Sequence, residues 1–308
     1  MNSLCSSVLS CSQFIFGAVS SNIDTQSQTA SEVIVFQSPR MDVIVPENPL
    51  APGAVRVVSN KETAGYANWT YDSRHESYEL LQKIVQIWRE EGIDDYMIFG
   101  KDSDGSSFAW EIVPYHESGL TLWKQFKVLF NLTFGAPNIS FEERQQVANK
   151  LVNPEALVAK SVKISALASK PDAFCNPEVI QNQRVFEGKH MNVLYNYAPI
   201  AIDENKLHFM MVPKEHHEKF SELTQEEYLE ASELEHKLIG YYNDKGYHTT
   251  YLFNKTGVEA GQTVPHWHQH VIFTATKTQE LYGKLIVLKN MIFGSSPLPK
   301  GELKNRVD

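Results

Sequence analysis

The chain has 308 residues, about twice the length of a typical domain, so the length favours two domains of ordinary size. Its composition, with 42% hydrophobic and 21% charged residues, supports a packed core and excludes collagen-like and disordered proteins. No apolar run approaches the roughly 20 residues of a membrane span. The net charge of -9 argues against a nucleic-acid partner, which requires a basic face, but leaves room for a small anionic ligand in a locally positive pocket.

The N-terminal part of the chain, residues 1–31, is rich in Ser, Gln, Thr and Asn, which predicts a poorly ordered polar segment. It contains no Lys or Arg, so it does not resemble a signal peptide, and we expect a cytoplasmic location. The three cysteines, Cys5, Cys11 and Cys175, form no CxxC spacing and are odd in number. This pattern argues against a disulfide framework and favours a reducing compartment.

From residue 35 onward the sequence repeats itself at the length of a domain. The matched pairs are Val35 with Val185 and Met41 with Met191 at a shift of 150, Gly92 with Gly246 and Phe99 with Phe253 at a shift of 154, and Leu122 with Leu281 at a shift of 159. The shift grows in one direction, as small loop insertions in the second copy would make it. The chain is therefore predicted to contain two copies of one fold.

Each copy reads as strands, a long helix, further strands and a closing helical stretch. In the first copy, a helix beginning near Ser73 and stopping at Gly92 precedes a strand over Asp95–Phe99. In the second, Thr224 and Glu227 form a capping-box pattern near the start of a helix predicted over Ser221–Asp244. The pattern predicts an α+β fold, with helices on one side of antiparallel sheets.

Chemistry is concentrated in the second copy, because nine of the eleven histidines lie between His190 and His270. Side chains alternate along a strand, so His266, His268 and His270 are expected to project from one face. Three imidazoles are costly in an apolar core and suit a polar cleft. The preceding loop, with Gly257, Gly261 and Thr263, can bring backbone N–H groups and a hydroxyl to an anion. Alternating histidines can also ligate zinc, although Glu259 is the single acidic residue close by in sequence.

The segment NKTGVEAGQTVPHWHQHVIF, from Asn254, resembles the signature of the histidine-triad (HIT) superfamily, and VPKEHH, from Val212, resembles its strand-end pattern. His208 falls where the family often has a histidine. The resemblance covers roughly 174–273 and, more loosely, the first copy. It implies two HIT-like domains in tandem, each an antiparallel sheet with a long helix, arranged as a pseudo-dimer.

The resulting domain prediction assigns 1–31 to the polar N-terminus, 32–141 to a degenerate HIT-like domain, 142–172 to a linker with a helical segment, and 173–308 to a HIT domain. The first copy is degenerate because its corresponding stretch, SSFAWEIVP from Ser106, contains no histidine. In the alignment Phe108 matches Trp267, and Ile112 matches Val271.

The resemblance implies that His268 is a nucleophile that attacks the α-phosphorus of a nucleotide and forms a nucleotidyl-histidine. It implies that His266 orients this ring, that His270 contacts the phosphoryl oxygens or the leaving group, and that His216 supports the cluster. The implied phosphate and nucleotide contacts are Asn254, Gly261, Gln262 and Thr263, together with Asn196 where the family often has an acidic ribose contact.

Two departures from the family pattern refine the prediction. Zinc-containing members carry CxxC ahead of the first strand, whereas Asp172 and Cys175 occupy those positions here, so neither a metal nor a cofactor is expected. Tandem transferases of the superfamily usually end their triad in Gln, so His270 favours the hydrolase branch.

The sequence therefore predicts a nucleotide hydrolase or nucleotidyltransferase acting on a small nucleotide conjugate, such as a nucleoside phosphoramidate or a dinucleoside polyphosphate. The alternatives are a non-catalytic nucleotide-binding regulatory module and a metal-dependent hydrolase that uses the histidine cluster. No nucleic-acid or membrane partner is expected, and further homodimerisation is left open.

Overall fold

A computed structural model of the protein describes residues 32–61, 65–103, 106–117, 119–153, 172–275, 285–286, 289–290 and 294–307. The predicted polar N-terminus and residues 154–171 of the predicted linker lie outside these ranges. Glu32–Asp308 forms one compact unit. The predicted domain boundaries stay predictions.

In both halves of the described chain, three strands, a long helix and two further strands follow one another in this order. The first half contains β1 (Val33–Gln37), β2 (Met41–Val45), β3 (Val55–Ser59), α1 (Tyr71–Glu90), β4 (Tyr96–Ser103), β5 (Ala109–Pro114), α2 (Thr121–Phe134) and α3 (Phe141–Val152). The second contains α4 (Pro177–Gln183), β6 (Arg184–Glu187), β7 (Met191–Tyr195), β8 (His208–Pro213), α5 (Gln225–Asn243), β9 (Thr249–Thr256), β10 (Gln269–Thr274) and α7 (Lys300–Val307).

Both long helices carry an N-terminal cap and a glycine stop that are visible in the sequence. Thr224 is the N-cap of α5 and forms the predicted capping box with Glu227, while the hydroxyl of Thr70 caps α1 by accepting a hydrogen bond from the Ser73 amide. Gly92 and Gly246 follow the helices with φ of 76° and 89°, a left-handed conformation that favours glycine. The predicted start of α5 at residue 221 was too early, because residues 220–222 form a separate 3-10 turn.

All ten strands of the described residues form one antiparallel sheet in the order β1-β2-β3-β5-β4-β9-β10-β8-β7-β6. The halves meet where β4 pairs with β9, and Phe99 lies directly opposite Phe253. These two residues are the pair that the sequence repeat matches at a shift of 154. The two copies are therefore related by a pseudo-twofold that passes through this pair, which confirms the predicted tandem α+β fold.

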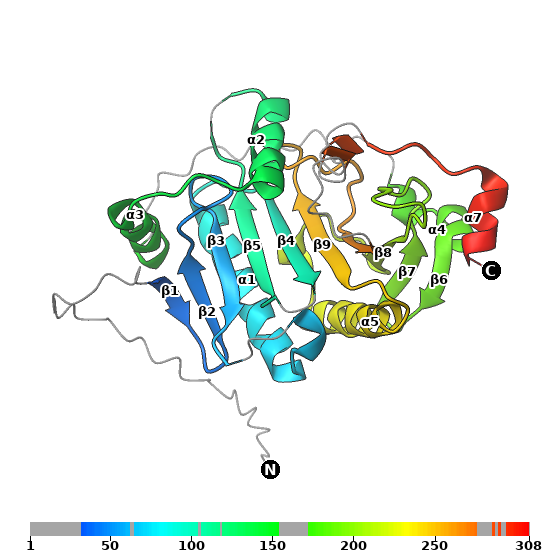
Figure 1. Ribbon diagram of the computed structural model, residues 1–308, viewed down its shortest axis with the longest axis horizontal. Helices are drawn as coiled ribbons and strands as arrows, with labels where there is room; N and C mark the ends of the chain where they lie inside the picture. The colour runs from blue at the N-terminus through cyan, green and yellow to red at the C-terminus, as the bar shows by residue number, and fades with distance from the viewer. Residues whose placement is uncertain are drawn as a thin grey trace, which may run out of the picture. The chain divides into compact units, whose positions relative to one another are not determined.

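The two faces of the sheet are covered differently (Figure 1). The main core lies between the sheet and α1 and α5, which contact each other, and it contains Ile84, Ile239 and Trp267. On the opposite face, Val128 of α2 packs against Met97 in a smaller apolar cluster. The side chains of His268 and His270 also lie on that second face, opposite the core that contains Trp267.

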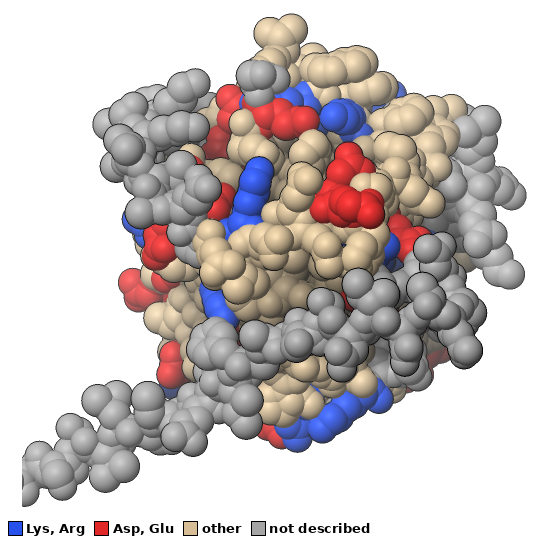
Figure 2. Space-filling model, turned by 90° about the vertical axis from the view of Figure 1, so that its left-hand side faces the viewer, with Lys and Arg blue, Asp and Glu red and all other residues tan. Residues whose placement is uncertain are grey.

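The surface carries charges of both signs. Figure 2 shows acidic and basic side chains interspersed over one face of the molecule. Among the residues that the structure describes, no helix is both long enough and apolar enough to cross a bilayer.

Candidate active site

The three alternating histidines lie at the start of β10. His270 belongs to the strand, whereas His266 and His268 precede it, although the sequence predicted all three within one strand. Alternation nevertheless holds, because Trp267 packs in the core under the helices while the ring centroids of His268 and His270 lie 4.8 Å apart on the other face. The structure therefore brings the predicted triad together.

The backbone determines which nitrogen of His268 is free. Its Nδ1 lies 2.8 Å from the carbonyl oxygen of His266, so Nδ1 carries the proton and donates it to that carbonyl. Burial is the main cause that lowers the pKa of His268 to about 4, so the ring is neutral at pH 7. Its Nε2 then carries an unshared electron pair, as a nucleophile requires.

His270 has the opposite tautomer, set through His208. The amide of Ile200 donates to Nδ1 of His208 at 2.9 Å, so the proton of His208 lies on Nε2. That Nε2–H faces Nδ1 of His270, also at 2.9 Å, and His270 must therefore accept there and carry its own proton on Nε2. Burial lowers the pKa of His208 to about 3 and lowers that of His270, which keeps both rings neutral. The triad thus presents an electron pair on one ring and an N–H donor on the next.

His266 belongs to a second cluster at the edge of the triad. Oδ2 of Asp172 lies 2.8 Å from Nδ1 of His216 and 2.9 Å from Nδ1 of His266. Sγ of Cys175 lies 3.6 Å and 3.8 Å from the same two nitrogens. All four donor atoms lie within 4.8 Å of one another. The predicted support residue His216 is therefore joined to the triad through His266.

This donor set fits a zinc ion, which takes Cys, His and Asp ligands in a tetrahedral arrangement. The sequence predicted no metal because the first Cys of the CxxC pattern is missing. The carboxylate of Asp172 nevertheless takes the position of that Cys in the cluster. Partial burial raises the pKa of Asp172, yet hydrogen bonds with Cys175 and His266 outweigh it and lower the pKa to about 2. Asp172 is therefore ionised at neutral pH. Its contribution to the site was not foreseen.

The loop before the triad is held by its own backbone and by Gln262. Gly257 and Gly261 have φ of 84° and 87°, and a Cβ at Gly257 would lie 1.6 Å from a carboxylate oxygen of Asp95. Oε1 of Gln262 accepts from the Gly257 amide at 2.8 Å, and its Nε2 donates to the Glu218 carbonyl at 2.9 Å. Gln262 thus shapes the loop, and both ends of its amide are already engaged.

The other residues predicted to contact the phosphate or nucleotide are Thr263, Asn254 and Asn196, and they differ in their surroundings. Thr263 is exposed, in the loop that precedes the triad. The side chain of Asn254 donates to Gln269 at 2.6 Å and is buried, so it does not meet the histidines. Asn196 accepts from the Ala198 amide at 2.9 Å and lies against His208. The structure therefore directs neither asparagine side chain toward open space at the triad.

Helix α2 of the first half holds this loop of the second half. The hydroxyl of Thr121 donates to Glu259 at 2.9 Å, and Lys124 forms an ion pair with the same carboxylate. Nε2 of Gln125 donates to the carbonyl of Glu259 at 3.0 Å. Asp95 accepts from the Glu259 amide at 3.1 Å. The half that lacks the triad therefore helps to position the loop beside it.

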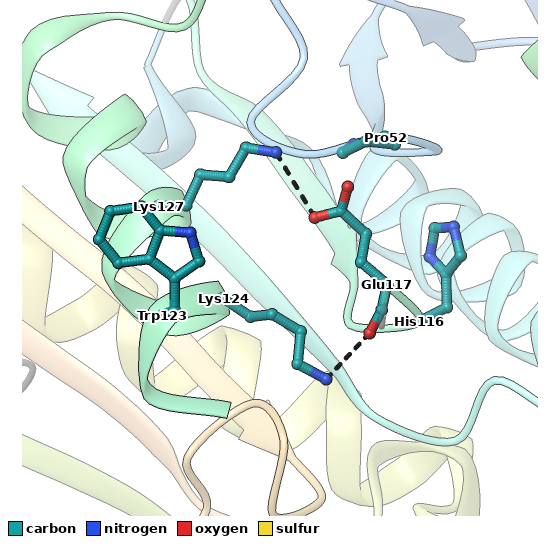
Figure 3. A pocket seen from close by; sticks show the side chains of 6 residues that line it. All are labelled: Pro52, His116, Glu117, Trp123, Lys124 and Lys127. Carbon is teal, nitrogen blue, oxygen red and sulfur yellow. Dashed lines mark hydrogen bonds and ion pairs between the residues drawn. The ribbon is translucent and has the colours of Figure 1, made fainter. Parts of the chain in front are cut away.

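A surface pocket of about 430 Å³ lies against the same helix, within the first half (Figure 3). Lys124 and Lys127 extend from α2 toward Glu117, which takes a hydrogen bond from Lys124 through its carbonyl and an ion pair from Lys127 at 3.5 Å. Because both lysines already have acidic or carbonyl partners, this pocket offers little unpaired charge to a ligand. None of its lining residues belongs to the triad.

The strand registers identify what replaces the triad in the first half. Phe99 pairs with Glu111 as Phe253 pairs with His270, so Glu111 is the counterpart of His270 at a shift of 159. At the same shift Ala109 replaces His268 and Ser107 replaces His266. The carboxylate of Glu111 is bonded to Nε of Arg56 at 2.6 Å. The first half therefore keeps the strand pattern and has no histidine at these positions.

The second half of the chain resembles a known protein family. Residues 178–277 match the family model described as HIT domain. An uncharacterized HIT-like protein of Methanocaldococcus jannaschii is 31% identical over 88 residues, which are 29% of this chain and 65% of the relative, less than two thirds of its length.

Two solved structures resemble most of the chain. A GalT-like protein of Arabidopsis thaliana is 12% identical with a TM-score of 0.51, covering 80% of both chains. An ADP-glucose phosphorylase of the same species, with bound ADP-glucose, is 12% identical with a TM-score of 0.52, covering 89% of this chain and 85% of the other. At this identity the likeness shows the fold alone, a tandem of HIT-like halves in one sheet.

Proposed function

Because residues 178–277 match the HIT domain, we propose that the protein is a nucleotide hydrolase or nucleotidyltransferase that acts through a nucleotidyl intermediate on His268. One observation carries the proposal: the bond from Nδ1 of His268 to the His266 carbonyl leaves Nε2 unprotonated. The second, mirrored tautomer at His270 supplies an N–H donor one ring away. A nucleophile beside a donor is the pairing that displacement at phosphorus requires.

In the first step Nε2 of His268 attacks the α-phosphorus of a nucleotide conjugate. A bond forms between nitrogen and phosphorus, the bond to the leaving group breaks, and the electron pair departs with that group. The ring becomes positively charged, and its Nδ1–H bond to the His266 carbonyl stabilises this charge. Nε2–H of His270 donates to a phosphoryl oxygen or to the departing atom.

In the second step water or another acceptor attacks the phosphorus, and the electron pair of the phosphorus–nitrogen bond returns to Nε2. The proton of the acceptor passes to solvent. The His270 terminus of the triad favours hydrolysis, whereas the bound ADP-glucose of the structurally similar phosphorylase is consistent with a nucleotide conjugate as substrate.

The four donors Asp172, Cys175, His216 and His266 would hold a zinc ion, which when bound supplies a rigid cross-link. Because the carbonyl of His266 holds His268, this cross-link would fix the nucleophile indirectly. Elemental analysis tests the assignment: we expect about one zinc per chain in the wild type and loss of it in His216→Ala.

The activity is tested with nucleoside phosphoramidates, dinucleoside polyphosphates and nucleotide sugars, comparing the wild type with His268→Ala. The matched control is His236→Ala, on α5 and outside the triad. We expect turnover and a nucleotidyl adduct by intact mass in the wild type and in the control, and neither in His268→Ala. Absence of turnover and adduct in the wild type would contradict the proposal.

The alternatives correspond to other outcomes of the same assay. Nucleotide affinity without chemistry, and equal in His268→Ala, would select a regulatory binding module. Activity that chelation abolishes, without a nucleotidyl adduct, would select a metal-dependent hydrolase. A small nucleotide ligand, a cytoplasmic location and the lack of nucleic-acid or membrane partners belong to the same proposal.

A further inference from the structure

Lys255 lies on the histidine-bearing face of the sheet. It belongs to β9, where it lies opposite Met97 of β4. Because Lys255 follows Phe253 by two residues, alternation places the side chains of Lys255 and Phe253 on one face of the sheet. The ring of Phe253 stacks on His270, with centroids 4.4 Å apart and planes 25° from parallel. Lys255 therefore projects on the side of the triad, although no motif singled it out in the sequence.

Its ammonium has no anionic partner among the described residues. Glu259 lies four residues after Lys255 in the sequence, but its carboxylate is bonded to Thr121 and Lys124. Burial lowers the pKa of Lys255 to about 8, so the side chain is still mostly charged at pH 7. The positive charge lies close enough to His268 and His270 to lower the pKa of both rings. A half-buried charge without a partner costs free energy unless a ligand compensates it.

The neutral rings around it cannot supply that compensation. His208, His268 and His270 are all held uncharged by burial, while Lys255 is a positive group that acts on both His268 and His270. The α-phosphate of a nucleotide conjugate can be met by Nε2–H of His270. A full positive charge beside this donor matches a second anionic group in the substrate.

We propose that Lys255 binds the phosphate that leaves, so that the substrate is a nucleotide joined through a pyrophosphate bond rather than through a neutral amine. The inference rests on the proposed function of His268. When the bond to the α-phosphorus breaks, the leaving phosphate gains negative charge, and the ammonium of Lys255 stabilises it in place. Lys255 keeps its own proton throughout, since the leaving phosphate departs as an anion.

The first test compares two substrates that share a base and differ in the leaving group: a nucleoside phosphoramidate and a dinucleoside polyphosphate. For Lys255→Met we expect kcat/KM to fall roughly 10- to 100-fold on the polyphosphate and to change by less than about threefold on the phosphoramidate. Lys255→Arg, which keeps the charge, should retain most of the polyphosphate activity. Equal losses on both substrates, or no loss on either, would overturn the assignment.

A binding test separates this inference from the proposed chemistry. Calorimetry with ADP as the probe should show at least about tenfold weaker binding to Lys255→Met than to the wild type, whatever the turnover. If the wild type binds ADP in this charge-dependent way but turns over nothing, the catalytic proposal fails while the Lys255 site stands. If binding is equal in the two proteins, or absent from both, the Lys255 site is wrong.

Folding provides a further check on the variant. Removing an uncompensated half-buried charge should leave the melting temperature of Lys255→Met equal to that of the wild type or above it. A lower melting temperature together with loss of ADP binding in Lys255→Arg as well would mean that Lys255 acts through packing, and the assignment would be overturned.

Discussion

The two halves share a sheet register and differ at all three positions of the triad. In the first half Glu111 replaces His270, and its carboxylate is bonded to Arg56 of the neighbouring strand. In the second half neutral rings stand beside Lys255, whose ammonium has no anionic partner among the described residues. In the first half the charge of Glu111 is therefore neutralised by Arg56, whereas in the second half the charge of Lys255 is available to a ligand.

The positions that carry the fold are those that the halves have in common. Phe108 and Trp267 are equivalent by register, and both are buried in the core that faces α1 and α5. Ile112 and Val271 form a second such pair. Because alternate residues of a strand serve opposite faces, the apolar face can be retained while the polar face loses its chemistry. Loss of histidines therefore need not disturb the first half.

The difference between the halves is tested most directly by removing the histidine at position 268 and adding one at the equivalent position of the first half. His268→Ala should lower kcat by at least about 1,000-fold, because no other group of the site can form the covalent intermediate. Adding Ala109→His to that variant should restore nothing, since the first half lacks the loop and the His270 donor. Steady-state turnover and intact mass report both results. Recovery of a nucleotidyl adduct in the double variant would show that the first half retains a working site.

A second contrast lies in the helix interface, where buried Leu81 of α1 has buried Glu235 of α5 as its counterpart at a shift of 154. Burial is the main cause that raises the pKa of Glu235 from 4.5 to about 8, although Tyr66 donates a hydrogen bond to it at 3.1 Å. The native state therefore keeps a proton that the unfolded chain loses above pH 4.5. Wild-type stability should fall as pH rises from about 4.5 to 8, by up to roughly 1.4 kcal/mol per pH unit.

The matching measurement is the free energy of unfolding of Glu235→Gln between pH 5 and pH 8. The amide cannot ionise, so the variant should gain on the wild type steadily across this window. Glu226→Gln, at an exposed position of the same helix, is the control. A constant difference between Glu235→Gln and the wild type across the window would rule out the buried proton.

Much of this fold could be predicted because its signals are local or repeated. The capping box of Thr224 with Glu227 depends on residues three apart, and the match of Phe99 with Phe253 needed only the collinear repeat. The alternation of His268 and His270 likewise predicted their shared face. Periodicity could not predict that His266 precedes the strand, because a strand end is set by pairing with other strands.

The rest of the site depends on contacts between distant segments. Asp172 meets His216 and His266 although it is 44 and 94 residues away from them, and its place in the CxxC pattern was interpreted as the loss of a ligand. The orientation of the Asn254 side chain could not be predicted from the sequence either, because its amide donates to Gln269 on the neighbouring strand. Lys255 is conspicuous only once the structure shows that its charge is unpaired among the described residues.

The tautomer relay distinguishes His270 from Glu111 and can be tested through His208. His208→Phe fills a similar volume and removes the N–H that His270 accepts, so the proton of His270 is no longer directed to Nε2. We expect kcat to fall roughly 10- to 100-fold. Nitrogen-15 chemical shifts of the His270 ring measure the tautomer directly, and His236→Ala serves as the control. An unchanged tautomer with unchanged kcat would show that His208 does not set it.

The smallest expected effect concerns the contacts through which α2 of the first half holds the loop beside the triad. Gln125→Ala removes the bonds from α2 to the carbonyls of Val258 and Glu259, at 3.4 Å and 3.0 Å. The loop should lose order, so we expect KM for a nucleotide substrate to rise roughly three- to tenfold, equivalent to about 1 kcal/mol. Gln86→Ala is the matched control, because Gln86 lies on α1 and bonds only to Glu90 among the described residues, at 2.9 Å. Since Gln125 touches no ring of the triad, kcat should change less than KM. A fall in kcat with constant KM would mean that α2 acts on the chemical step, and equal behaviour of the two variants would mean that the first half contributes packing alone.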